Sequence, residues 1–135
     1  MSSIKNELND RIYVDEQHKY ERRCIVVFDF RNAVLKVKKK DRDFVKNHII
    51  ETILKAIVLS KDNQFVLNVL AGNIKKNRLY PPFVLALARI CKSTFDDKMY
   101  KCFIRRPSRL FRVVYAILAL MGDQETKEKI VITKD

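Results

Sequence analysis

The side chains in this sequence that are best suited to chemistry are clustered lysines and arginines. They fall into three groups along the chain, and the members are Lys38, Lys39, Lys40, Lys75, Lys76, Arg78, Arg105, Arg106, Arg109 and Arg112. The chain has a formal net charge of +12 at pH 7, and such an excess attracts nucleic acid, anionic membranes or acidic proteins. We take the three groups as candidates for binding an anionic ligand. A solvated, lysine-rich surface is the alternative interpretation.

Residues able to act as catalysts or metal ligands are few and scattered. His18 lies in a polar stretch and His48 in an amphipathic one, and neither has a neighbouring nucleophile or acid that would form a catalytic pair. The cysteines Cys24, Cys91 and Cys102 form no Cys-x-x-Cys pair, so we expect buried free thiols in a reducing compartment. The two isolated glycines exclude a P-loop or a Rossmann turn. We therefore expect no catalytic residue, no metal site and no cofactor.

Asp29 is the one carboxylate that falls near the end of a predicted strand. The run Cys24–Phe30 is apolar on both faces, which is typical of a central strand covered on each side. Ligands of open α/β sheets usually bind at the carboxyl ends of the strands. Alternatively, Asp29 caps the following turn at Arg31 and Asn32. The sequence leaves both roles open.

The elements that must position these side chains alternate between strands and helices. We expect strands at 24–30, 99–104 and 130–133, and helices at 44–58, 64–71, 83–92 and 110–121. This order predicts an α/β fold with a small, mainly parallel sheet and covering helices. We expect one domain over 1–135, in which 1–23 form a polar arm or helix and 36–92 form a helical insertion.

Apolar segments of membrane-spanning length are missing from the sequence. The longest apolar runs, at 83–91 and 113–121, are too short for a bilayer, and the first residues do not resemble a signal peptide. We expect a cytoplasmic protein, with peripheral membrane association left open.

The segment Met99–Thr133 follows the order of a known family. A strand leads to Pro107, a helix begins near Phe111 and carries Tyr115 one turn later, and an Asp-x-x-Thr stretch leads to Lys-Ile. This order resembles the core of CRAL-TRIO domains, the fold of phosphatidylinositol-transfer and retinal-binding proteins. The matching positions are Asp29, Pro107, Phe111, Tyr115, Asp123, Thr126, Lys129 and Ile130. The resemblance implies that these residues mark the fold rather than contact a ligand.

The sequence departs from the family in ways that bear on function. Arg105 and Arg106 stand where the family has an asparagine before the proline. The N-terminal helical lobe is missing or reduced to 1–23, and the sequence stops at the Ile130 strand, where the family continues with a gating helix. We therefore expect a CRAL-TRIO-like core that lacks the parts needed to close a lipid pocket.

Three functions remain open after the sequence is considered. The first is a non-enzymatic CRAL-TRIO-like module that binds a lipophilic ligand or an anionic, phosphoinositide-containing membrane surface. The second is a pocketless protein-interaction or homodimerisation module, because a small sheet leaves open edges. The third is nonspecific nucleic-acid binding by the basic surface. We favour it less because there is no tryptophan and most aromatic residues fall in core-like positions.

Overall fold

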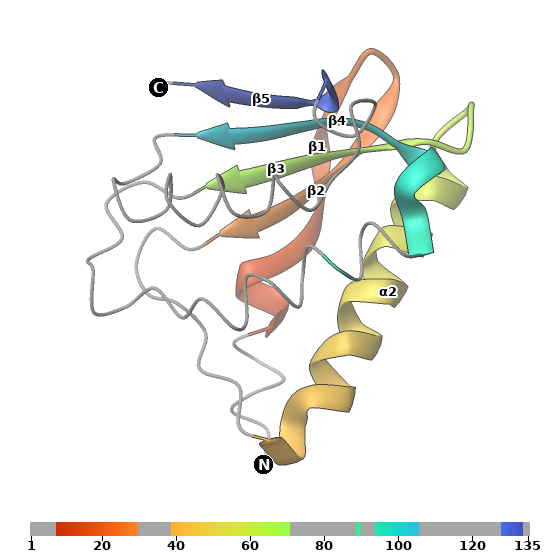
Figure 1. Cartoon of the computed structure of the whole chain (residues 1–135). Helices are drawn as coiled ribbons and strands as arrows, with labels where there is room; N and C mark the ends of the chain where they lie inside the picture. Colours follow the sequence, from red (N-terminus) through yellow and green to blue (C-terminus); the bar gives the residue numbers. More distant parts are fainter. Residues whose placement is uncertain (1–7, 30–38, 71–88, 90–93, 106–127, 134–135) are drawn as a thin grey trace.

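The described part of the structure is organised around one five-stranded sheet. A computed structural model describes residues 8–29, 39–70, 89, 94–105 and 128–133 of the chain. The strands are β1 (Ile12–Tyr20), β2 (Arg23–Asp29), β3 (Phe65–Leu70), β4 (Met99–Arg105) and β5 (Ile130–Thr133), and they lie in sequence order across the sheet (Figure 1). β1 pairs antiparallel with β2, and the other three pairings are parallel. The predicted α/β fold with a mainly parallel sheet is confirmed.

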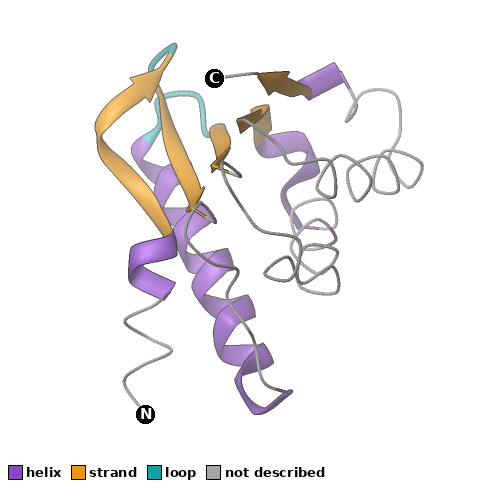
Figure 2. Ribbon diagram, turned by 90° about the vertical axis from the view of Figure 1, so that its left-hand side faces the viewer, coloured by secondary structure: helices purple, strands orange, loops and turns teal. Residues whose placement is uncertain are grey.

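One long helix covers one face of this sheet. Helix α2 (Arg42–Leu59) follows the short 3₁₀ turn η1 (Lys39–Asp41) and packs across β1, β2 and β3 (Figures 1 and 2). It buries Val45, Ile49, Ile53 and Ala56 against the sheet. These positions recur every three to four residues, which is the spacing of one face of an α-helix.

The strands bury side chains on both faces of the sheet. The side chains of the hydrophobic cluster beneath α2 alternate with others along the strands, and they include Cys24, Val26, Phe28, Phe65, Leu67, Val69, Cys102 and Ile104. On the opposite face, Val27 and Val66 are only 3% and 1% exposed. Central parallel strands covered on both faces read as continuous apolar runs, and this explains the composition of β2 and β3.

The expected helix at 64–71 is wrong, because this segment forms β3. It pairs in parallel with β2 on one side and β4 on the other. Five of its six residues are apolar, and burial on both faces removes the alternation that would have distinguished a strand from a helix. The segment 36–92 is therefore not wholly helical, because it contributes a central strand.

The expected polar arm or helix at 1–23 is also wrong in its second half. Residues 8–11 are helical, but Ile12–Tyr20 form the edge strand β1. Ile12 and Val14 are buried at alternate positions, while the polar residues after Asp15 are exposed. A bulge between Asp15 and Lys19 interrupts the pairing with β2, and such irregularities are common on edge strands.

A two-residue turn joins β1 to β2. Tyr20 pairs with Arg23, and the two residues between them have positive φ angles, 47° for Glu21 and 71° for Arg22. Two successive left-handed residues define the tight hairpin turn whose twist matches that of paired strands. Glycine or asparagine normally fills such positions, so Glu21 and Arg22 carry no turn signal in the sequence. The predicted helices at 83–92 and 110–121 lie almost wholly outside the described residues.

Candidate functional site

The carboxyl ends of the parallel strands form a single edge with mixed chemistry. Asp29 of β2 is in register with Leu70 of β3, Leu70 with Arg105 of β4, and Arg105 with Thr133 of β5. Because adjacent strands are spaced by about 4.8 Å, Asp29 and Arg105 stand about 10 Å apart along this edge. An acidic, an apolar, a basic and a hydroxyl side chain thus end four neighbouring strands.

Arg105 is the best-defined cation on this edge. Its Nε donates a hydrogen bond of 2.8 Å to Oδ1 of Asn68 on β3, and its guanidinium carbon lies 5.2 Å from the centre of the Phe103 ring. Asn68 is the register partner of Phe103, so all three side chains emerge on the face away from α2. Both Arg105 and Asn68 are partly buried.

The outer part of the guanidinium has no polar partner among the described residues. No further hydrogen bond or ion pair of Arg105 occurs within the residues that the structure describes. Arginine stays charged at any physiological pH, and its planar fork matches the two oxygens of a phosphate or carboxylate. Asn68 uses only Nε, so the two terminal nitrogen atoms have no hydrogen-bond partner in the described part of the chain.

Two predicted lysines lie just before helix α2. Lys39 and Lys40 belong to η1 and are exposed. Figure 1 shows that α2 runs obliquely across the sheet and that its amino end lies away from the arrowheads of β2, β3 and β4, so these lysines are not brought to the carboxyl edge. Asp41 precedes the helix, and its side chain makes no capping hydrogen bond.

Most of the other predicted residues fall outside the described part of the chain. Asp29 ends β2 as predicted, and Lys129 directly precedes Ile130, the first residue of β5. Asp29 and Lys129 both have interactions with other groups. The predicted residues outside the described ranges are Lys38, Lys75, Lys76, Arg78, Arg106, Pro107, Arg109, Phe111, Arg112, Tyr115, Asp123 and Thr126.

Asn68 is the residue of this candidate site that sequence reasoning missed. It is the only polar residue in the apolar run Phe65–Leu70, for which the sequence pattern predicts a helix. Turn residues bound this short apolar run on both sides. A single polar residue in such a run can indicate a strand whose polar side chain contacts a specific partner. That sign identifies a position worth testing, but it does not identify Arg105 as the partner.

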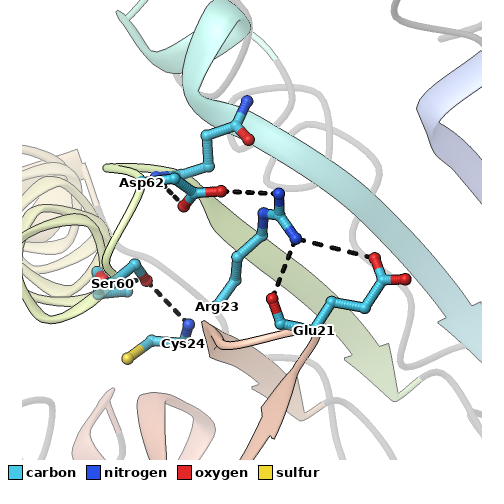
Figure 3. A network of polar contacts seen from close by, with 7 residues as sticks. Glu21, Arg23, Cys24, Ser60 and Asp62 are labelled. Atoms are coloured by element: carbon cyan, nitrogen blue, oxygen red, sulfur yellow. Dashed lines mark hydrogen bonds and ion pairs between the residues drawn. The ribbon is translucent and has the colours of Figure 1, made fainter.

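A second polar cluster lies at the start of β2, at the opposite end of the strand from Asp29. The guanidinium of Arg23 lies 2.7 Å from an Asp62 carboxylate oxygen and donates to the Glu21 carbonyl oxygen at 3.1 Å (Figure 3). It also lies 3.5 Å from the centre of the Tyr100 ring. Its side chain is 18% exposed. A hydrogen bond with the Glu21 side chain, helped by partial burial, raises the pKa of Tyr100 above its ordinary value of 10.0.

This second cluster ties elements together. Arg23 is surrounded by groups from the hairpin turn, from the turn before β3 and from β4, so its charge is already neutralised. Tyr20 of β1 adds an edge-to-face contact with Phe103 of β4, with ring centres 5.1 Å apart. The cluster therefore fastens the hairpin to the sheet.

Metal sites and membrane-spanning helices are both missing from the described residues. No three histidine, cysteine, aspartate or glutamate side chains gather there in a way that could hold a metal ion. None of the helices described is both long and apolar enough to cross a membrane.

Comparison with known proteins gives a likeness of fold. No protein-family model matches the sequence, and no curated protein matches it. Among solved structures, the crystal structure of Sfh5 superposes with a TM-score of 0.73 at 15% sequence identity, over 96% of this chain and 51% of the Sfh5 chain. The chain thus spans about half the length of Sfh5, a Sec14-family protein with a CRAL-TRIO fold. At this identity the comparison shows the fold alone: the chain has a CRAL-TRIO-like α/β core.

Proposed function

We propose that this chain is a non-enzymatic lipid-binding module that holds an anionic lipid headgroup, of the phosphoinositide class, at the carboxyl edge of its sheet. The observation that carries the proposal is the guanidinium of Arg105, which Asn68 orients through Nε while its two terminal nitrogens make no hydrogen bond within the described residues. The CRAL-TRIO-like fold and the net charge of +12 support the same function.

The proposal assigns different roles to the two side chains. Arg105 supplies the charge and the paired donors that a phosphate requires. Asn68 acts as a positioning residue, because its Oδ1 fixes the plane of the guanidinium. Lys39 and Lys40, which are exposed before α2, add long-range attraction to an anionic leaflet. Each basic side chain near such a surface contributes about 1 kcal/mol.

Vesicle co-sedimentation tests this function directly. Phosphatidylcholine vesicles, alone or with added phosphatidylserine or phosphoinositide, are mixed with the wild type and with Arg105→Gln. We expect binding only to the anionic vesicles, and about fivefold or more weaker binding by Arg105→Gln, since about 1 kcal/mol corresponds to a factor of about five. The matched control is Lys98→Gln, which removes the same charge from an exposed site that precedes β4 at the opposite edge.

Asn68→Ala separates orientation from charge. It keeps the net charge, so binding to phosphatidylserine vesicles should stay close to that of the wild type. Binding to phosphoinositide vesicles should fall, because a freely rotating guanidinium loses its fixed geometry. Equal binding to neutral and anionic vesicles, or equal losses in Arg105→Gln and Lys98→Gln, would contradict the proposal. Tight binding to nucleic acid without any binding to vesicles would also contradict the proposal.

A further inference from the structure

The end of the hairpin between β1 and β2 contacts the same aromatic ring that lies beside Arg105. The ring centre of Tyr20 lies 5.1 Å from that of Phe103 in an edge-to-face contact. The guanidinium carbon of Arg105 lies 5.2 Å from the centre of the same Phe103 ring. Two strands separate β1 from β4 in the sheet, so the hairpin bends over the sheet to make this contact (Figure 1). The Phe103 ring therefore links the hairpin to the candidate anion site.

We infer that Tyr20 is a positioning residue for Arg105, and that seating of the hairpin end on β4 raises the affinity of Arg105 for an anion. This inference rests on the proposed function and adds a means of regulating the same site. Asn68 holds Nε of the guanidinium, Phe103 contacts the guanidinium, and Tyr20 restricts the Phe103 ring. A side chain that is already held in its binding geometry loses less freedom when it binds, so its affinity is higher.

The pairing of the hairpin end with the rest of the sheet is short. Beyond the bulge of β1, two pairs continue the ladder with β2, Lys19 with Cys24 and Tyr20 with Arg23. The residues of the bulge are exposed. Exposed backbone with few buried contacts is typical of segments that open locally at a low cost in free energy. The hairpin end therefore has two states, one seated on β4 and one lifted, and Phe103 loses its contact with Tyr20 in the lifted state.

Side-chain contacts hold the hairpin end in the seated state. The Tyr20 ring centre also lies 6.3 Å from that of Tyr100, and the guanidinium of Arg23 lies over the Tyr100 ring and pairs with Asp62. If the seated state raises the affinity of Arg105 for an anion, then a bound anion must stabilise the seated state by the same factor, because coupling between two equilibria is reciprocal. The inference can therefore be tested from either end.

Titration calorimetry with a water-soluble, short-chain phosphoinositide measures the affinity of the whole chain without a membrane. Tyr20→Leu should weaken binding about two- to fivefold, the factor that corresponds to one exposed cation–π contact, because the Phe103 ring is no longer held beside Arg105. Tyr20→Phe keeps the ring and should bind like the wild type. The matched control is Phe44→Leu, which makes the same kind of change at a 46% exposed ring on α2 and should leave the affinity unchanged.

A double-mutant cycle tests whether Tyr20 acts through Phe103. Phe103→Leu should weaken binding at least as much as Tyr20→Leu does, because it removes the ring itself. The double variant Tyr20→Leu/Phe103→Leu should lose no more affinity than Phe103→Leu alone, since effects that pass through one shared contact are not additive. Losses that simply add would overturn the inference. Thermal melts of each variant show that binding is measured on folded protein.

Hydrogen exchange tests the coupling from the other end. The same phosphoinositide should slow exchange of the amides at 19–22 in the wild type and leave it unchanged in Arg105→Gln. A purely structural role of Tyr20 predicts no such dependence on the lipid, so equal exchange with and without it would overturn the inference. Wild-type affinity in Tyr20→Leu would do so too, while weaker binding by Arg105→Gln would leave the proposed function intact. If Arg105→Gln binds like the wild type, the proposed function itself fails.

Discussion

Ser60 shows how a single buried hydroxyl joins two elements. Its Oγ accepts a hydrogen bond of 2.8 Å from the Cys24 amide and donates one of 2.8 Å to the Ala56 carbonyl oxygen (Figure 3). The residue is 4% exposed. The hydroxyl therefore caps the end of α2 and at the same time satisfies the first buried amide of the central strand β2.

Replacing Ser60 with alanine should destabilise the fold more than its small volume suggests. Ser60→Ala leaves the buried Cys24 amide without its acceptor, and an unsatisfied buried donor costs about 1–3 kcal/mol. Urea denaturation followed by circular dichroism measures the free energy of unfolding. Lys46→Ala, at an exposed position of α2, is the control and should change it by less than about 0.5 kcal/mol. Equal effects of the two substitutions would contradict the role assigned to Ser60.

At the scale of single residues, the sequence predicted which side chains carry a charge better than it predicted which side chains contact one another. It identified Arg105 as a cation and Asp29 as the end of a strand. It could not pair Arg105 with Asn68, because the two side chains meet only when β3 and β4 lie side by side. The Arg23 cluster was missed for the same reason, since its members come from residues 21, 23, 62 and 100. Long-range contacts of this kind have no local pattern.

At the scale of elements, the hairpin between β1 and β2 carries measurable strain. Glu21 and Arg22 both occupy the left-handed region, which costs a residue with a side chain about 1–2 kcal/mol. The twist of the strands and the contacts of Glu21 with Arg23 and Tyr100 hold the turn in this form. Arg22 has no described contact of this kind, so its conformation is imposed by its neighbours.

Arg22→Gly should therefore stabilise the protein. Glycine adopts positive φ without steric conflict, and the relief outweighs its greater entropy in the unfolded chain, leaving a gain of about 0.5–1 kcal/mol. Thermal unfolding measures the gain as a higher melting temperature. Lys19→Gly is the matched control, because it removes a long exposed side chain from the strand β1, and it should lower the melting temperature. A lower melting temperature for Arg22→Gly would show that the turn is not strained.

The errors in the predicted elements have a common physical origin. A short run buried on both faces, such as Phe65–Leu70, has no alternation, so pattern alone cannot separate strand from helix. β1 was missed because its bulge and its exposed polar half hide the alternation of Ile12 and Val14. By contrast, β2, β4 and β5 were predicted within one or two residues, and the predicted helix at 44–58 lies within α2. Charged or turn-forming residues mark the ends of each of these segments in the sequence.

At the scale of the whole molecule, the excess of positive charge acts on the proposed lipid-binding surface. It draws the carboxyl edge of the sheet towards anionic lipid. Raising the salt concentration from about 0.1 M to about 1 M shortens the Debye length from about 10 Å to about 3 Å. This attraction should therefore weaken as salt is added.

We expect vesicle binding to weaken steeply over this range of salt, for the wild type and for Arg105→Gln alike, because the charge of the whole chain supplies most of the attraction. Co-sedimentation with phosphatidylserine vesicles measures the change, and neutral phosphatidylcholine vesicles serve as the control. Binding that does not change with salt would indicate insertion of apolar side chains instead.

The order of the strands has a consequence for how the chain assembles. Each of the described strands lies beside its neighbour in sequence, from β1 to β5, so none of these five has to be inserted between two that are already paired. During synthesis at about 5–20 residues per second, the hairpin of β1 and β2 would form first, and β3 would follow within a few seconds, after α2. Each new strand would then pair with the strand that was formed just before it, at the edge of the sheet. The sheet can therefore build from the amino terminus onward, in the order in which the ribosome releases it.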